Sequence, residues 1–505
     1  MEALDWLVIG VFFLALIGII VWVVRQKQND SADYFLGGRD ATWLAIGASI
    51  FASNIGSEHL IGLAGAGASS GMAMAHWEIQ GWMILILGWV FVPFYSRSMV
   101  YTMPEFLERR YNPQSRTILS VISLVSYVLT KVAVTVYAGG LVFQQVFGIK
   151  ELWGIDFFWI AAIGLVVLTA IYTIFGGMKS VLYTSVLQTP ILLLGSLIIL
   201  VLGFKELGGW DEMMRVCGAV TVNDYGDTMT NLIRSNDDAN FPWLGALIGS
   251  AIIGFWYWCT DQFIVQRVLS GKNEKEARRG TIFGAYLKLL PVFLFLIPGM
   301  IAFALHQKYI GAGGEGFLPM LANGTANADA AFPTLVAKLL PAGVKGLVVC
   351  GILAALMSSL ASLFNSSAML FTIDFYKRFR PETPEKKLVG IGQVATVVIV
   401  ILGILWIPIM RSVGDVLYTY LQDVQSVLAP GIAAAFLLGV CWKRTSAQGG
   451  MWGLISGMVI GLTRLGAKVY YSNAGEVADS TFKYLFYDMN WLFFCGWMFL
   501  FCMIV

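Results

Sequence analysis

The chain has 505 residues, of which 58% are hydrophobic and only 13% are charged, and its formal net charge is +2. A soluble globular domain carries about 25% charged residues, so half that share cannot cover a water-facing surface. The composition excludes a soluble enzyme, a disordered chain and a nucleic-acid-binding protein. It indicates instead a protein that crosses a membrane many times.

Long apolar runs follow one another along almost the whole chain. A helix needs roughly 20 mostly apolar residues to span a membrane, and about thirteen runs meet this requirement. They are continuous rather than alternating, which favours helices over the strands of a barrel. The sequence therefore predicts an all-α polytopic membrane protein with spans at 5–24, 42–67, 77–95, 118–147, 156–175, 182–204, 242–266, 281–304, 341–375, 389–410, 415–440, 449–470 and 489–505.

The basic residues predict the orientation of the chain. If the loop 25–41 is cytoplasmic and the sides alternate, about 20 of the 33 Lys and Arg residues fall in cytoplasmic loops. Basic residues are retained on the cytoplasmic side of a membrane. We therefore expect a multi-pass protein of the plasma (cell inner) membrane with its N-terminus outside. Lys131 and Arg464 lie inside apolar runs, and the residues around them suggest no role.

Residues that could form an enzyme active site or a metal centre are sparse. The six Cys residues have neither metal nor disulfide spacing, and we interpret them as packed thiols. His59, His76 and His306 do not form a metal-binding set, and no nucleophile stands beside a base. The chain is not expected to be an enzyme or to hold an organic cofactor.

The second apolar run is crowded with Gly and Ser and carries Asn54, Glu58 and His59 in its middle. Gly weakens a helix, Ser competes for backbone hydrogen bonds, and polar side chains at this depth are costly. An interrupted helix near the middle of a membrane exposes carbonyls to a cation and side chains to a substrate. The alternative is close packing of helices through small residues.

The ninth run carries a stripe of small and hydroxyl residues. Ala355, Ser358, Ser359 and Ser362 have the spacing of one helix face. Such a stripe is more often a close-packing surface, but hydroxyls can also be neutral oxygen ligands. Together with the carbonyls of a broken helix, the stripe predicts a Na+ site.

Other polar residues also interrupt apolar runs, namely Glu78, Lys288, Gln422 and Asp423, and the segment 255–262 is rich in Trp and Tyr before Asp261. A Lys near a helix end often extends to the membrane surface, and aromatic residues often form a belt there. Taken together, however, these donors, acceptors and flat rings match a sugar or a cyclic polyol. An amino acid or carboxylate would favour a more cationic site.

Several motifs, including Phe-Ala-Ser-Asn-Ile-Gly-Ser-Glu-His at 51–59, resemble those of a known family. The chain is similar to the sodium/glucose cotransporters of the sodium:solute symporter family, in family order over nearly its whole length. The matching stretches are 47–65, 102–111, 171–180, 256–262, 286–289, 356–366, 371–376 and 432–438.

The resemblance implies a LeuT-like core of two inverted five-helix repeats. The first repeat is expected at 42–204 and the second at 242–440, separated by an extracellular loop at 205–241. An additional N-terminal helix and cytoplasmic loop occupy 1–41, and C-terminal flanking helices occupy 441–505.

The resemblance also implies roles for individual residues. The sugar-binding set is Asn54, His59, Glu78, Lys288 and Gln422, with Tyr257 stacking on the sugar ring as an inner gate and Trp258 beside it. The outer gate is Leu63, Trp77 and Tyr418. The Na+ ligands are the carbonyls of Ala52, Ile55 and Ala355 and the hydroxyls of Ser358 and Ser359.

Three positions depart from the family pattern. Ser185 and Ala361 replace an Asp and a Thr of a second Na+ site, so we expect one Na+ per sugar. Gly254 replaces a Thr or Asn, which removes one possible sugar contact.

The function implied by the resemblance is symport of Na+ with a monosaccharide of the glucose or galactose type. A symporter for myo-inositol or another small organic solute is the alternative, and a sensor or a uniporter is the rival from another class. Na+ is the expected coupling ion. The expected partners are the monosaccharide and membrane lipid, without nucleic acid or an obligatory protein partner.

Overall fold

The computed structural model describes residues 1–505 except 27, 29, 57, 322–323, 414–416 and 474–477. At 129, 409–413, 417–423 and 472–473 it describes the helix but not the side chains. The sequence-based expectations for Tyr418 and Gln422 therefore lie outside the described side chains.

The first half of the chain is helical apart from one short hairpin. Its helices are α1 (Ala3–Val24), α2 (Ser31–Leu36), α3 (Trp43–Asn54), α4 (Ala64–Ser69), α5 (Ala75–Ile79), α6 (Met83–Ile86), α7 (Val92–Ser98), α8 (Met103–Arg110), α9 (Pro113–Ser126), α10 (Ala133–Phe147) and α11 (Phe157–Leu207). Short turns of tighter or wider helix join them: η1 (Gly37–Arg39), η2 (Glu58–Leu63), η3 (Gly71–Met74), η4 (Gln80–Trp82), η5 (Leu87–Phe91) and η6 (Tyr127–Val132). The hairpin pairs β1 (Glu151–Leu152) with β2 (Ile155–Asp156).

The second half follows the same pattern. Its helices are α12 (Trp210–Gly218), α13 (Trp243–Phe255), α14 (Gln262–Leu269), α15 (Glu274–Leu287), α16 (Ile297–Gly311), α17 (Ala331–Leu339), α18 (Val344–Met369), α19 (Lys377–Phe379), α20 (Glu385–Val413), α21 (Leu417–Cys441), α22 (Ala447–Asn473), α23 (Thr481–Lys483) and α24 (Trp491–Ile504). Between them lie η7 (Trp256–Thr260), η8 (Val292–Leu296), η9 (Ala328–Ala330), η10 (Leu370–Tyr376) and η11 (Tyr484–Asp488).

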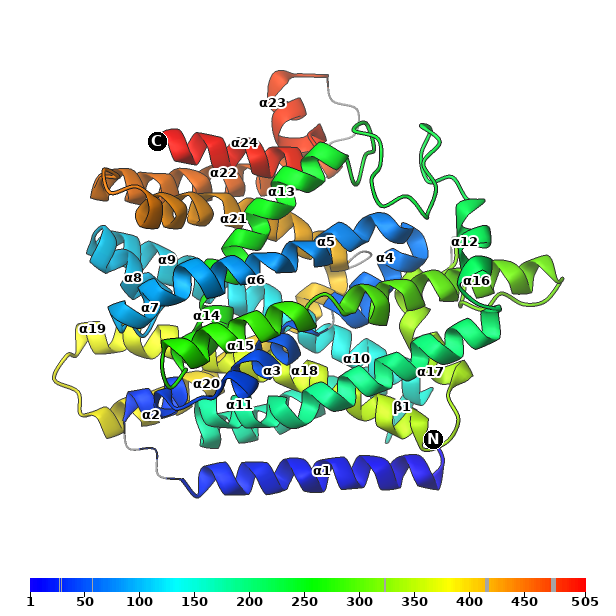
Figure 1. Cartoon of the computed structure of the whole chain (residues 1–505), viewed down its shortest axis with the longest axis horizontal. Helices are drawn as coiled ribbons and strands as arrows, with labels where there is room; N and C mark the ends of the chain where they lie inside the picture. Colours follow the sequence, from blue (N-terminus) through cyan, green and yellow to red (C-terminus); the bar gives the residue numbers. More distant parts are fainter. Residues whose placement is uncertain (27, 29, 57, 322–323, 414–416, 474–477) are drawn as a thin grey trace.

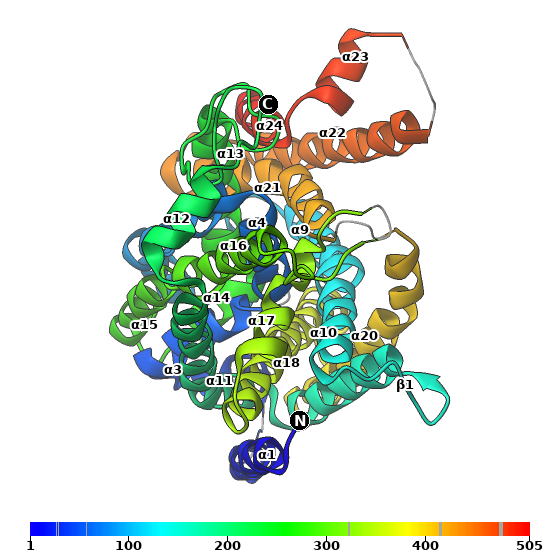
Figure 2. The same cartoon turned by 90° about the vertical axis from the view of Figure 1, so that its right-hand side faces the viewer.

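The helices form one bundle with α18 at its centre. Helix α11 packs along α18, and α3 packs against α15, α11 and α18. Figures 1 and 2 both place α1 at one edge of the bundle and α22 and α24 at the opposite edge. The broken helix α3 and the Ser-rich helix α18 are thus neighbours in the interior.

The number of spans differs from the sequence-based expectation of thirteen. Among the described residues, nine helices are long and apolar enough to cross a membrane, or up to ten if the bent pair Thr481–Asp488 and Trp491–Ile504 is one span. The run 42–67 is broken into short pieces, 449–470 is not among the nine, and 156–175 and 182–204 are joined in α11. The predicted all-helical polytopic class is confirmed, and the number thirteen is not.

Helix α11 is unusually long because it consists of two helical arms that meet at Gly177. The helix has 51 residues, but Gly177 within it is non-helical, with φ of 53° and ψ of −147°. A Cβ at this position would lie 2.4 Å from the carbonyl oxygen of Tyr34. This left-handed, tightly packed position favours Gly and divides α11 into two arms close to the two predicted spans.

Candidate functional site

The break in the second apolar run positions the first group of predicted site residues. Helix α3 ends at Asn54, and Ile55 is extended, with ψ of 105°. The chain resumes at the wide helical turn η2, which carries His59 and Leu63. A Cβ on Gly56 would lie 2.8 Å from the Ser359 hydroxyl, so the break rests directly on α18.

Three charged or titratable side chains meet beside this break. Lys288 Nζ donates to Glu78 Oε2 at 2.5 Å and lies 2.8 Å from His59 Nε2, which is 3.2 Å from Glu78 Oε1. All three side chains are buried. Gly81 makes room for them, because a Cβ there would lie 2.4 Å from Lys288 Cγ. Lys288 is therefore held in the interior and does not extend to the membrane surface.

The aromatic cluster at 255–262 lies in the interior as well. It contains η7, in which Trp258 is 2% exposed and Tyr257 9% exposed, so neither residue belongs to a surface belt. Asn54 Nδ2 donates to the Tyr257 hydroxyl at 2.9 Å. The rings of Tyr257 and Trp258 pack edge to face at 4.9 Å, and Lys288 Nζ lies 5.6 Å from the Trp258 ring centre.

These residues line one narrow cavity of about 30 Å³. It brings together eight residues expected from the sequence: Asn54, His59, Leu63, Trp77, Glu78, Tyr257, Trp258 and Lys288. Glu58, which the sequence marks only as a polar residue of the broken run, also lines the cavity. Three further lining residues were not expected: Gln80, Ile253 and Gln425. Glu58, Gln80 and Gln425 could have been identified from the sequence, because each is a polar residue within four positions of an expected site residue.

The cavity wall contains polar atoms without a protein partner. Asn54 Oδ1, His59 Nδ1 and Gln80 Oε1 are buried and have no hydrogen-bond partner among the described residues. An unpaired buried polar group costs about 1–3 kcal/mol. A ligand with several hydroxyl groups could satisfy such atoms.

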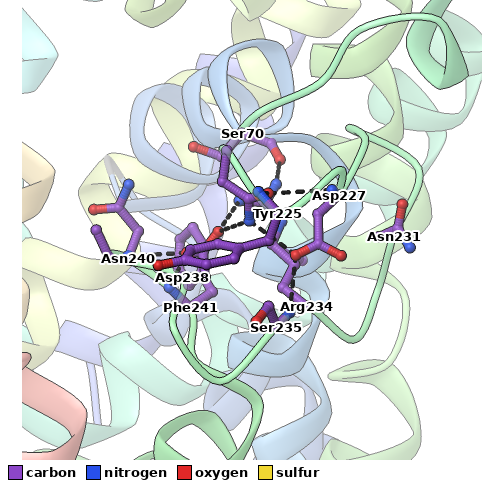
Figure 3. Close-up of polar contacts among 12 residues, drawn as sticks. Ser70, Tyr225, Asp227, Asn231, Arg234, Ser235, Asp238, Asn240 and Phe241 are labelled. Carbon is purple, nitrogen blue, oxygen red and sulfur yellow. Dashed lines mark hydrogen bonds and ion pairs between the residues drawn. The ribbon is translucent and has the colours of Figure 1, made fainter.

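The turn that precedes the cavity residues Trp77 and Glu78 is joined to the long loop after α12. Arg234 Nη2 donates to the Ser70 carbonyl, and Arg234 Nη1 lies 3.5 Å from Asp238 Oδ2 (Figure 3). The guanidinium also lies 5.5 Å from the ring centre of Phe241, whose ring contacts His76 at 5.4 Å between centres. We call Arg234, Asp238 and Phe241 the loop clasp. It fixes the turn that precedes Trp77 and Glu78.

The predicted Na+ ligands lie where the Ser stripe meets the break. Ser359 Oγ donates to the Ser53 carbonyl at 2.8 Å and lies 3.3 Å from the Ile55 carbonyl oxygen. Ser358 Oγ is 3.2 Å from Ser185 Oγ. Ala52 and Ala355 are buried in the same packed helices.

These oxygens suit a monovalent cation better than a divalent one. The groups are hydroxyls and carbonyls, and the described residues contain no cluster of three or more His, Cys, Asp or Glu that could hold a metal. Ser185 also lies 3.4 Å from Ser49 Oγ. Ser185, one of the three residues that depart from the family pattern, thus lies next to the Ser stripe and contributes a hydroxyl rather than a charge.

Lys131 acquires a partner that the sequence did not suggest. Its Nζ donates to Asp261 Oδ2 at 2.7 Å and lies 4.6 Å from the ring centre of Tyr257. Tyr127 also donates to Asp261. Arg267, further along α14, donates from Nε to Ser53 Oγ at 3.1 Å. Buried charged side chains therefore lie next to Tyr257, and one of them, Arg267, contacts the broken helix at Ser53.

Sequence comparison links the chain to membrane transporters of two solute types. The human sodium/myo-inositol cotransporter 2 is 38% identical over 479 residues, covering 92% of this chain and 70% of that protein. The rat sodium/glucose cotransporter 2 is 38% identical over 512 residues, covering 97% of this chain and 75% of that protein.

Structure comparison shows the fold. A Na+-coupled sialic acid symporter in a substrate-bound outward-open state matches with a TM-score of 0.79 and 22% identity, covering 100% of this chain and 96% of the other. The transporter MhsT in complex with L-phenylalanine matches with a TM-score of 0.55. The fold is LeuT-like, as expected.

The model of the sodium:solute symporter family matches residues 34–457, which include the broken helix, the cavity and the Ser stripe. The resemblance found in the sequence is thereby confirmed, and so is the expectation that the chain is a transporter and not an enzyme. This Na+-coupled, multi-pass membrane protein is a member of the sodium:solute symporter family.

Proposed function

We propose that this chain couples inward movement of one Na+ to uptake of one monosaccharide of the glucose or galactose type by alternating access. The single observation that supports the sugar most strongly is the cavity wall. Its two closest opposite charges, on Glu78 and Lys288, are paired with each other. Beside them, buried atoms of Asn54, His59 and Gln80 have no hydrogen-bond partner in the part of the chain that the structure describes. This wall suits a neutral ligand with several hydroxyl groups.

The proposed binding step assigns a role to each group. A sugar ring stacks on Tyr257 with Trp258 beside it, and its hydroxyls bond to Asn54, His59, Glu78, Lys288 and Gln422. Trp77, Leu63 and Tyr418 close over it from outside. Hydrogen bonds to the charged pair are the strong ones, because an ionised partner roughly doubles their strength.

Na+ is the second cargo in this proposal. Carbonyls of Ala52, Ile55 and Ala355 and hydroxyls of Ser358 and Ser359 bind it between the broken helix and α18. Binding there joins the two helices and stabilises the outward-open arrangement. Inward movement of one charge across 100 mV adds about 2.3 kcal/mol to the driving force.

The proposed topology has thirteen crossings with the N-terminus outside, in the plasma or inner membrane. Three features support it. The two arms of α11 are divided at Gly177. The pieces α3, η2 and α4 together are long enough to cross, and α22 has 27 residues. The two inverted repeats, 42–204 and 242–440, remain part of this proposal.

The decisive experiment is uptake of labelled galactose and glucose into proteoliposomes containing the purified protein. We expect uptake that requires an inward Na+ gradient and increases with an inside-negative potential. Equal uptake with a K+ gradient would contradict coupling and favour the uniporter.

Myo-inositol is the second candidate solute, because the human myo-inositol cotransporter and the rat glucose cotransporter are equally identical to this chain, at 38%. Competition of unlabelled myo-inositol against labelled galactose separates the two. Complete inhibition at a lower concentration than that of unlabelled galactose would assign the cavity to the polyol.

The Na+ ligands make a specific prediction. Ser359→Ala removes the hydroxyl that lies between the Ser53 and Ile55 carbonyls. We expect at least about a tenfold rise in the Na+ concentration for half-maximal uptake, corresponding to about 1.4 kcal/mol. Ser120→Ala is the matched control, because Ser120 is equally buried and its hydroxyl donates to the Arg116 carbonyl of its own helix. Equal Na+ dependence in both variants would reject the site.

A further inference from the structure

Gln80 is a buried amide that nothing in the sequence assigned to the site. It lies in η4, two residues after Glu78, and it lines the cavity. Its side-chain oxygen is buried without a hydrogen-bond partner among the described residues. Glu78, its neighbour on the same wall, is by contrast fully engaged with Lys288 and His59.

Gly254 on the facing helix α13 provides the space that Gln80 fills. A Cβ at 254 would lie 2.7 Å from Gln80 Oε1 and 3.2 Å from Gln80 Cβ. Any side chain at 254 would therefore push the amide out of its present place. Gln80 and Gly254 act as a pair, in which the absence of one side chain permits the position of the other.

A packing role alone accounts poorly for this arrangement. An apolar side chain of the same size would fill the space without the cost of an unpaired buried polar atom. The cost disappears when an occupant of the cavity donates a hydrogen bond to the amide oxygen. The lining side chains Ile253 and Trp77 have no acceptor that could replace it.

We propose that Gln80 is a specificity-determining residue, whose amide oxygen accepts a hydrogen bond from one hydroxyl group of the transported solute on the side that faces α13. Gly254 maintains the amide in that position. The inference rests on the proposed function, and it identifies the solute as one with a hydroxyl donor at this edge of the ring.

The test uses the full-length protein in proteoliposomes with labelled galactose and its monodeoxy derivatives. Gln80→Met keeps the length of the side chain and removes the acceptor. We expect kcat/KM for galactose to fall about tenfold, since the hydrogen bond to a buried neutral acceptor is lost. For one monodeoxy derivative, which lacks the bonded hydroxyl, the wild type and the variant should be equal.

Gly254→Ala tests the geometry without changing Gln80. We expect it to reduce kcat/KM for the same solute and to leave the same monodeoxy derivative unaffected. In a Gln80→Ala background, the added methyl group should have little further effect. Gln80→Asn supplies a shorter acceptor, so it remains informative if the Met variant is unstable in detergent.

Gln393→Met is the matched control, because Gln393 donates to the Ile174 carbonyl away from the cavity. Its specificity should equal that of the wild type. Identical profiles of Gln80→Met and wild type over all derivatives would overturn the inference while leaving the proposed function intact. Failure of wild-type protein to take up any sugar with Na+ would instead overturn the proposed function itself.

Discussion

At the scale of single residues, the cavity depends on a buried set of charges that satisfy one another. Lys288, Glu78 and His59 are each nearly inaccessible, and each is within 3.2 Å of another member. Removing one partner of a buried ion pair leaves an uncompensated charge, which costs more than the pair contributes as a whole. The set therefore acts as one unit in both stability and binding.

Lys288→Met should destabilise the protein by about 3–5 kcal/mol, because it leaves Glu78 buried without its cation. The expected observation is a lower Tm in detergent and loss of Na+-driven uptake. Adding Glu78→Gln should recover part of the Tm and none of the uptake, since the neutral pair lacks the charged hydrogen-bonding groups.

An exposed ion pair is the control for this prediction. Arg215→Met breaks the surface pair with Glu212 and should leave the Tm unchanged. A Tm of Lys288→Met equal to that of wild type would show that the buried set does not support the fold.

The cavity residues that can be identified from the sequence are those whose chemistry is unusual for their surroundings. Asn54, His59 and Glu78 stand out because they interrupt apolar runs. Lys131 also stands out, but its partner Asp261 is 130 positions away, and the pattern along the chain cannot pair them. Gln80 was missed because its importance comes from the missing side chain at Gly254 on another helix.

At the scale of elements, the loop clasp links the long loop after α12 to the turn that precedes the cavity residues Trp77 and Glu78. Arg234 binds the Ser70 carbonyl, and the adjacent Gly71 has a left-handed φ of 75°. A Cβ on Gly71 would lie 2.1 Å from the Met229 carbonyl oxygen, so the loop sits directly on the turn. Helix α5, which carries both Trp77 and Glu78, starts just after this fixed turn.

Arg234→Lys should raise the KM for the solute by about threefold to tenfold with a smaller change in kcat. The ammonium cannot bind Ser70 and Asp238 with a planar fork, so the cavity wall is less preorganised. Uptake kinetics in proteoliposomes measure the effect. Lys308→Met removes a comparable contact with the Leu207 carbonyl, far from the cavity, and should leave KM unchanged.

Asp238 sets the pH range over which the clasp persists. Burial raises the pKa of this carboxyl, but hydrogen bonds from the backbone of Phe241 and Asn240 and from Asn223, with the charge of Arg234, lower it below the ordinary 3.8. Since the native pKa is lowered, the stabilisation is present above the ordinary value and is lost only as pH falls through the lower one. The difference in KM between Arg234→Lys and wild type should thus be constant from pH 7.5 to 5.

Some features of the helices could be predicted from the sequence and others could not. The break after Asn54 was predictable, because Gly and Ser crowd a run that also carries polar side chains. Hydropathy did not settle the number of spans. Gly177 breaks α11 between two predicted spans, and its close packing against the Tyr34 carbonyl is not visible in the local sequence pattern. The small-residue face of α18 and its approach to the Ile55 carbonyl were predicted, but its contact with the Ser53 carbonyl was not.

At the scale of the whole molecule, the two ends of α22 distinguish the proposed thirteen crossings from a smaller number. Lys443 before α22 should lie inside and Asp479 after it outside. In a Cys441→Ser background, whose other five Cys residues are buried, Asp479→Cys should react with an impermeant maleimide in intact cells. Lys443→Cys should react only after permeabilisation. Equal labelling of both would show that α22 does not cross.

The break after α3 connects the solute cavity to the predicted Na+ site through a few consecutive residues. Asn54 holds the Tyr257 hydroxyl on one side of the cavity, and the carbonyls on either side of it, those of Ser53 and Ile55, face Ser359. In the proposed cycle, a peptide unit that shifts to meet the cation must also shift the amide that meets the solute. Thermodynamic linkage then requires reciprocity: any substitution that weakens the effect of Na+ on solute affinity weakens the effect of the solute on Na+ affinity by the same factor. The coupling free energy between the two cargoes would thus be transmitted within three consecutive residues.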